Sequence, residues 1–266
     1  MTTGALIFAF NNEQIDYVAM ANWSAKNIHR HLGIPVCLVT DKEPIQPHVF
    51  DSVAIANPVN AGQRYFSDYN ANVTWHNTNR MDAYTLSPWD QTLVLDADYV
   101  VASNRLSTVL KSRQDFLCYR WARDVTGLQT FEDLNYFGNY RMPMWWATVM
   151  MFRRSNSAKL LFDAMQMIRD NWTHYRNLYK NPNPTYRNDH ALSIALNTLT
   201  GHTLQVDSIP GTLASLTPDH RLTQLDRDSY RVDFLTSDKK PRWITVTQDF
   251  HAMGKQQLGA IVANPL

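Results

Sequence analysis

Two aspartates one residue apart, Asp96 and Asp98, follow the apolar run at 92–95 and are the residues best suited to chemistry. Such a run is typical of a buried strand, and carboxylates just past it would lie at the carboxyl edge of a sheet, where open α/β sheets bind ligands. Carboxylates at alternate positions can hold one hard cation. The segment Asp96-Ala97-Asp98 therefore predicts a divalent metal held for a diphosphate, although such a pair can also be an ordinary strand end.

Further candidates lie near the end of the chain, where His251, Gly254 and Lys255 follow an apolar segment. His251 could supply a third metal ligand, and two carboxylates with one imidazole suit Mn²⁺ or Mg²⁺ better than zinc. Lys255 could meet a diphosphate as a point charge, and Gly254 would let the backbone approach a ligand closely. The alternative for His251 is an ordinary surface or core histidine.

The run Tyr186-Arg187-Asn188-Asp189-His190 opens a predicted helix. An aspartate at this position can cap the N-terminus of that helix. The functional alternative is that Asp189 accepts hydrogen bonds from sugar hydroxyls.

Alternating apolar runs and helical periodicities predict an α/β fold around these candidates. Strands are expected at 5–10, 35–39, 52–55, 92–95, 149–152 and 243–247, and helices at 15–32, 78–86, 157–175 and 189–199. Asn11 and Asn12 are expected to cap the first helix, with Glu13 in its first turn and Gly33 at its end. The first strand–helix–strand unit should be parallel and right-handed, and the segments 62–77 and 124–144 should be irregular.

With 266 residues and 44% hydrophobic content, the chain can form one large domain. The net charge of +1 hides an uneven distribution, because residues 105–188 hold 13 Lys and Arg against 6 Asp and Glu, together with 15 aromatic residues. This middle region favours an acidic or planar partner, unless it is a solvated face over a core of rings.

Cys37 and Cys118 have neither metal nor disulfide spacing, which favours buried thiols in a reducing compartment. Apolar runs too short for a signal or a span predict a cytoplasmic protein without membrane contact.

Taken in order, these motifs resemble those of GT-A glycosyltransferases, and most closely the retaining, glycogenin-like family 8 transferases. The resemblance extends from residue 5 to residue 255 and is carried by Phe8-Ala9-Phe10-Asn11-Asn12 with Tyr17, by Arg80 ahead of Asp96-Ala97-Asp98, by Trp146-Ala147-Thr148-Val149, by Asp189-His190, and by His251 to Gly254. It implies a GT-A-type, single-domain α/β/α sandwich with a mostly parallel central sheet. Residues 1–104 would bind the nucleotide sugar, and residues 105–266 would form the acceptor side.

The resemblance also assigns expected roles. The donor, a UDP-sugar, would be bound by Phe10, Asn11, Tyr17, Arg80, Asp96, Ala97, Gly254 and Lys255, with the Tyr17 ring stacked on uracil. Mn²⁺ or Mg²⁺ would be held by Asp96, Asp98 and His251. Arg80, Asp189 and His190 would act at the sugar, where His190 stands in place of the family's Gln.

The sequence thus predicts a metal-dependent, retaining glycosyltransferase that moves a sugar from a UDP-sugar to an acceptor hydroxyl. Arg176, Tyr179, Lys180, Tyr186 and Arg187 interleave cations and rings, which suits phosphates and stacked bases. The chain also resembles viral enzymes that glycosylate hydroxymethylated pyrimidines in DNA, so DNA is one candidate acceptor. A glycan, a lipid-linked sugar or a protein hydroxyl is another.

Two other function classes stay open. A haloacid-dehalogenase-type phosphatase also has Asp-x-Asp after a strand, but its later acidic metal motif is missing from this sequence. A non-catalytic module that binds nucleic acid or glycan is the third possibility, and a test of metal dependence separates it from the enzymes.

Overall fold

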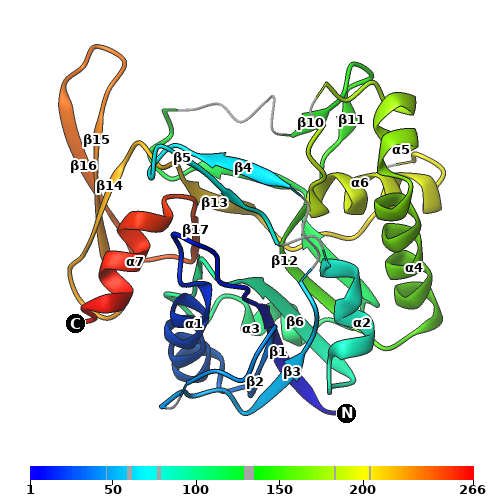
Figure 1. Ribbon diagram of the computed structural model, residues 1–266, viewed down its shortest axis with the longest axis horizontal. Helices are drawn as coiled ribbons and strands as arrows, with labels where there is room; N and C mark the ends of the chain where they lie inside the picture. Colours follow the sequence, from blue (N-terminus) through cyan, green and yellow to red (C-terminus); the bar gives the residue numbers. More distant parts are fainter. Residues whose placement is uncertain (46, 59–61, 77–78, 129–134, 183, 204) are drawn as a thin grey trace.

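The computed structural model describes residues 1–266 except 46, 59–61, 77–78, 129–134, 183 and 204. A six-stranded sheet with the order β3-β2-β1-β6-β12-β8 lies at its centre (Figure 1). Its strands are β1 (Thr3–Phe8), β2 (Val36–Thr40), β3 (Ser52–Ile55), β6 (Gln91–Asp96), β8 (Phe116–Tyr119) and β12 (Trp146–Arg153). The strands β1, β2, β3 and β6 pair in parallel, and β12 runs antiparallel to β6 and β8. The predicted α/β class with a mostly parallel central sheet is confirmed, and the architecture is compatible with a GT-A fold.

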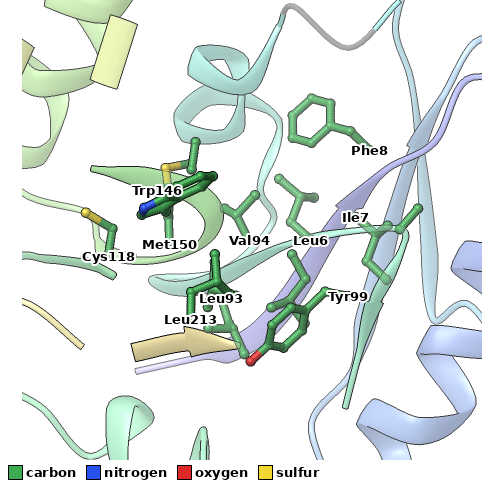
Figure 2. Packing of buried hydrophobic residues seen from close by; sticks show 14 of the residues in the cluster. Leu6, Ile7, Phe8, Leu93, Val94, Tyr99, Cys118, Trp146, Met150 and Leu213 are labelled. Atoms are coloured by element: carbon green, nitrogen blue, oxygen red, sulfur yellow. The ribbon is translucent and has the colours of Figure 1, made fainter. Parts of the chain in front are cut away.

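The central strands are apolar along their length because both faces of the sheet are covered. Leu6 of β1 and Val94 of β6 are paired neighbours and fully buried. Figure 2 shows both close to Met150 of β12 in the core. Cys37 and Cys118 are buried and free, as the sequence predicted.

Helices lie on both sides of this sheet. Figure 1 shows α1 (Tyr17–Leu32) and α7 (Lys255–Ala263) to its left, where they contact each other, and α2 (Ala83–Leu86), α4 (Asn156–Asp170) and α6 (Asn188–Leu199) to its right. The shorter helices are η1 (Arg80–Asp82), α3 (Ser107–Leu110) and α5 (Trp172–Leu178).

The first helix begins later than predicted. Its N-cap is Asp16, whose side chain accepts a backbone N–H of the first turn, so the helix starts at Tyr17 and Glu13 lies outside it. The Asn11 side chain accepts a hydrogen bond from a first-turn N–H at 2.9 Å and supports the same helix end. Gly33 ends the helix as predicted, because its left-handed conformation (φ 63°) suits glycine.

Two other predicted helices differ from the structure. The segment 78–86 forms only η1 and the single turn α2, and its first residue falls outside the described residues. The helix predicted over 157–175 is divided at Asn171, so Trp172 and Tyr175 belong to α5 rather than to the face of α4. The hydrophobic periodicity continues in register across Asn171, so the pattern alone could not predict the break.

A second, smaller sheet joins distant parts of the chain. It has the order β7-β17-β13-β9, formed by β7 (Tyr99–Val100), β17 (Phe250–Ala252), β13 (Thr212–Leu216) and β9 (Trp121–Asp124). The strand β17 is antiparallel to β7 and parallel to β13. Because β7 directly follows the turn after β6, this pairing places residues 250–252 beside the carboxyl edge of the central sheet.

Three antiparallel units complete the fold. Residues 62–77, predicted as irregular, instead contain a hairpin of β4 (Gln63–Phe66) and β5 (Ala71–Thr74). Part of the second predicted irregular segment forms β10 (Tyr136–Phe137) and β11 (Met142–Pro143), while residues 129–134 of it lie outside the described residues. The predicted late strand is β16 (Pro241–Val246), paired with β15 (Tyr230–Leu235) and through it with β14 (Arg221–Gln224). Figure 1 shows the β15–β16 arm extending from the body.

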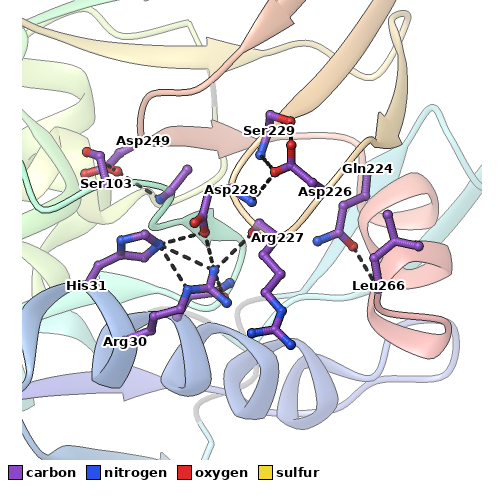
Figure 3. A network of polar contacts seen from close by, with 12 residues as sticks. Arg30, His31, Ser103, Gln224, Asp226, Arg227, Asp228, Ser229, Asp249 and Leu266 are labelled. Atoms are coloured by element: carbon purple, nitrogen blue, oxygen red, sulfur yellow. Dashed lines mark hydrogen bonds and ion pairs between the residues drawn. The ribbon is translucent and has the colours of Figure 1, made fainter.

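A polar network fastens the base of this arm to α1. Asp228, in the β14–β15 turn, forms an ion pair with Arg30 and lies 2.9 Å from His31 Nε2 (Figure 3). Arg30 also donates to the carbonyl of Arg227 at 3.0 Å. Partly exposed ion pairs contribute little each, so the network serves mainly to orient the arm.

Gly4 provides a test of packing in β1. A Cβ built at this position would overlap the indole of the buried Trp89, so we expect Gly4→Ala to lower the free energy of unfolding by about 1–3 kcal/mol. Gly259→Ala in α7 is the matched control, because its Cβ would lie 3.5 Å from Met20 Cε and should be neutral or stabilising by up to about 1 kcal/mol. Urea denaturation measures both, and equal stabilities would contradict the packing argument.

Candidate functional site

A cavity of about 330 Å³ opens where β1 and β6 end. The hairpin β4–β5, the start of β12, the start of α6 and β17 complete its lining. Of the residues predicted from the sequence, the cavity is lined by Phe10, Tyr17, Arg80, Asp96, Ala97, Asp98, Asp189, His251 and Lys255. The volume lies within the roughly 300–1,000 Å³ range of small-molecule sites. Asn11, His190 and Gly254 are not part of this lining.

Asp96, Asp98 and His251 come together at the floor of the cavity. One potential ligand atom from each lies within 4.8 Å of the others. The β7–β17 pairing produces this cluster, since His251 lies opposite Tyr99 and the Ala252 N–H donates to the Asp98 carbonyl at 3.0 Å. Two carboxylates and an imidazole form a donor set that fits Mn²⁺ or Mg²⁺. The His251 Nδ1 atom is buried and has no hydrogen-bond partner in the described part of the chain, which also fits an absent ligand.

Each carboxylate of the pair already faces a buried cation. Arg80 forms an ion pair with Asp96, donates to the Leu95 carbonyl at 3.4 Å and lies over the Phe8 ring at 5.2 Å. Lys255 forms an ion pair with Asp98, whose Oδ2 also lies 3.3 Å from His251 Nε2.

The titration of these groups follows from their surroundings. Burial alone would raise the pKa of Asp98, but the charges of Lys255 and His251 outweigh it and hold that pKa well below its usual range. Burial lowers the pKa of Arg80 to about 10, so this guanidinium stays charged at neutral pH. The floor of the cavity thus sets Asp96 against Arg80 and Asp98 against Lys255.

Tyr17 presents a second orphaned polar atom to the cavity. Its hydroxyl is buried and has no hydrogen-bond partner among the described residues. Burial and the charge of Asp98 raise the pKa of Tyr17, so the phenol remains neutral. A buried hydroxyl without a partner is unfavourable, which is consistent with a polar ligand in the cavity.

Asp189 reaches the cavity from the first turn of α6, but it does not cap that helix. Its Oδ1 accepts the Ala147 N–H of β12 at 2.9 Å, and its Oδ2 accepts Arg187 Nη2 at 2.7 Å. Burial would raise the pKa of Asp189, but Arg187 and the Ala147 N–H lower it, so the carboxyl is ionised. Asp189 therefore ties α6 to β12 on the cavity wall, and lone pairs remain for a ligand hydroxyl.

His190 points away from the cavity, in contrast to the role expected from the sequence. Its ring stacks between Phe137 at 5.1 Å and Trp172 at 5.8 Å, and Nδ1 lies 3.2 Å from the Asn181 amide nitrogen. Consecutive residues of an α-helix point about 100° apart, and here Asp189 faces the cavity while the next residue, His190, turns into the core.

The burial of His190 makes a pH dependence of stability testable. Burial and the nearby charge of Arg187 lower its pKa to about 4, against roughly 6.5 in an unfolded chain. The unfolded state therefore binds more protons between these values, and stability should fall by about 3 kcal/mol as the pH decreases from 6.5 to 4. Urea denaturation of the wild type and of His190→Gln should show a shallower acid dependence in the variant, and parallel profiles would contradict this assignment.

Asn11 and Gly254 serve the framework instead of the cavity lining. The Asn11 amide is engaged at the start of α1, where it also donates to Asp16 at 2.9 Å. Gly254 precedes α7, and a Cβ there would lie 3.4 Å from Pro218 Cα, which is an ordinary packing distance. The roles expected of Asn11 and Gly254 at the donor stay predictions.

The comparisons with known proteins find similarity among solved structures. No protein-family model matches the chain, and no curated protein does. Among solved structures, the chain is similar to the glycosyltransferase GlyE of Streptococcus pneumoniae TIGR4, at 16% identity and a TM-score of 0.41 over 78% of this chain and 45% of GlyE. It thus spans less than half of GlyE.

Two further solved structures are similar to the chain. They are the galactosyltransferase LgtC, at 13% identity and TM-score 0.49 over 73% of this chain and 70% of LgtC, and mouse xyloside xylosyltransferase 1, at 10% identity and TM-score 0.42 over 76% and 83%. Likenesses of this degree place no individual residue of the site.

The hairpin β4–β5 supplies site residues that the sequence interpretation missed. Arg64, Phe66 and Trp75 from this region line the cavity opposite β6. The sequence does contain one signal for this hairpin: two short potential strands, 63–66 and 71–74, flank the turn-forming residues Ser67 to Asn70.

The basic and aromatic residues proposed for the acceptor are dispersed. Arg187 lines the cavity, whereas Tyr186 is buried against Trp172. Lys180 is exposed beside the Tyr140 ring at 5.4 Å. Within the described residues, no helix combines the length and the apolar character needed to cross a bilayer.

Proposed function

We propose that this protein is a metal-dependent glycosyltransferase that uses a nucleotide-sugar donor. The observation that carries the proposal is the cluster of Asp96, Asp98 and His251 in a cavity that also presents Arg80 and Lys255. A diphosphate leaving group needs its developing negative charge neutralised, and this floor combines a metal-ligand set with two ammonium or guanidinium cations. Mn²⁺ or Mg²⁺, when bound there, would supply Lewis-acid stabilisation of the diphosphate.

The chain's own residues have distinct roles in this proposal. Arg80 and Lys255 donate hydrogen bonds to diphosphate oxygens, and the Tyr17 ring stacks on the base, which the resemblance identifies as uracil. Asp189 accepts a hydrogen bond from a sugar hydroxyl while its contacts to β12 keep it in place. The acceptor hydroxyl attacks the anomeric carbon as the bond to the diphosphate breaks, with retention of configuration in keeping with the resemblance.

For the acceptor we propose a hydroxymethylated pyrimidine in DNA. The support is Arg187 at the start of α6, a cation that lines the cavity together with the rings of Phe66 and Trp75. Cations suit the phosphate backbone, and rings suit a base that has left the stack. A glycan or protein hydroxyl is the alternative outcome of the test.

The test is the incubation of the protein with a panel of nucleotide sugars and Mn²⁺, with plain DNA, hydroxymethylated DNA or oligosaccharides. We expect release of UDP that a chelator abolishes, and a hexose or pentose mass gain on hydroxymethylated DNA only. UDP release with a mass gain on an oligosaccharide would keep the transferase and replace the acceptor. Phosphate release from monoesters without turnover of any nucleotide sugar would favour the phosphatase class, and metal-independent binding alone would favour the binding module.

A further inference from the structure

Arg64 of the hairpin β4–β5 extends its guanidinium into the cavity. The group lies over the Trp75 ring at 4.8 Å and near the Phe66 ring at 5.5 Å. No described residue forms a hydrogen bond or an ion pair with it. A guanidinium that stacks on rings keeps its N–H donors free at its edge, and the described residues offer Arg64 no acceptor for them.

The other cations that line the cavity all have carboxylate partners. Arg80 is paired with Asp96, Lys255 with Asp98, and Arg187 with Asp189. Of the cationic side chains in the described lining, Arg64 is therefore the one without such a partner.

The electrostatics around Arg64 are also unfavourable in the absence of a ligand. Burial lowers the pKa of Arg64 and the nearby like charge of Arg187 lowers it further, and the charges of Asp189 and Asp98 offset only part of this shift. The charge of Asp189 is already engaged by Arg187 at 2.7 Å. An anion placed against Arg64 would offset both the lost hydration of its guanidinium and the repulsion from Arg187.

We propose that Arg64, with Arg187 beside it, forms an oxyanion-binding subsite that takes a phosphate or carboxylate group of the sugar donor. The subsite rests on the proposed glycosyltransferase function. Two parts of a donor carry this chemistry, namely the diphosphate and a carboxylate on the transferred sugar, as in a uronic acid. The planar guanidinium matches either group in a bidentate manner, which a lysine cannot do.

Isothermal titration calorimetry in the presence of Mg²⁺ tests the subsite with pyrophosphate, glucuronate, UDP-glucose and UDP-glucuronic acid. The variants are Arg64→Gln, Arg64→Lys and the control Arg113→Gln, which removes an exposed arginine outside the cavity. We expect Arg64→Gln to weaken binding about 10- to 100-fold, because hydrogen bonds to a charged group are lost, and Arg64→Lys to restore only part of it. Circular dichroism establishes that each variant is folded.

The ligands whose binding is weakened show whether the subsite takes the diphosphate or a carboxylate of the sugar. Weaker binding of pyrophosphate and both UDP-sugars would assign the subsite to the diphosphate. A loss limited to glucuronate and UDP-glucuronic acid would assign it to a sugar carboxylate. Equal affinities of Arg64→Gln and Arg113→Gln for all four ligands would overturn the subsite.

The same titrations separate this inference from the proposed function. Binding of UDP-sugars by the wild type that Arg64→Gln leaves unchanged would leave the glycosyltransferase intact and remove the subsite. Binding of pyrophosphate or glucuronate that depends on Arg64, without binding of any UDP-sugar, would keep the subsite and remove the donor. Failure of the wild type to bind any of the four would overturn both.

Discussion

Asp98→Asn should reduce Mn²⁺-dependent release of UDP by at least about 10³-fold. Asparagine keeps the shape of the side chain but removes one of the two charges in the cluster of Asp96, Asp98 and His251. The same change leaves the buried Lys255 without its counter-charge, so the protein should also lose stability. Initial rates with UDP-sugar and titrated Mn²⁺ measure the loss of activity.

Two further variants make this result interpretable. Asp238→Asn removes an exposed carboxylate at the tip of the β15–β16 arm and should leave the rate unchanged. Asp98→Asn combined with Lys255→Met removes both charges of the buried pair and should recover stability without activity. Substantial metal-dependent turnover by the folded double variant would refute the role of Asp98.

Lys255→Met should lower the melting temperature of the metal-free protein by roughly 5 °C, which for a chain of this length corresponds to about 3 kcal/mol. The reason is that Asp98 would remain ionised and buried without the ammonium that now neutralises it. Mn²⁺ should then raise the melting temperature more in the variant than in the wild type, because it no longer competes with Lys255 for Asp98.

Thermal denaturation with Mn²⁺ or with a chelator measures this competition. Lys42→Met, which alters an exposed lysine, should match the wild type in both conditions. An identical Mn²⁺-induced shift in Lys255→Met and the wild type would mean that the ammonium and the metal do not share Asp98.

The sequence predicted the floor of the site better than its walls. Asp96 and Asp98 could be located because they follow a continuous apolar strand, a local pattern that depends on few residues. His251 was a sound candidate because it also follows a short apolar segment, although nothing local shows that β17 pairs with β7. The pairing is a long-range property, which the sequence suggests only through the order of its motifs.

The walls depend on side-chain direction and on contacts between distant elements. Asp189 and His190 are adjacent in the sequence, yet one faces the cavity and the other stacks on Phe137 and Trp172. Arg64 was overlooked because its hairpin is polar and has little hydrophobic periodicity. Propensity alone therefore could not assign these side chains to a site.

From the pairing of β17 with β7 we expect a definite order in which the protein becomes competent to bind metal. Asp98 and His251 are roughly 150 residues apart, so closing this contact carries a large entropic cost and favours its formation late in folding. A nascent chain whose residues 250–252 are still within the ribosome holds the aspartate pair without its third ligand. Capture of the metal by all three side chains would accordingly report that the chain has completed its tertiary structure.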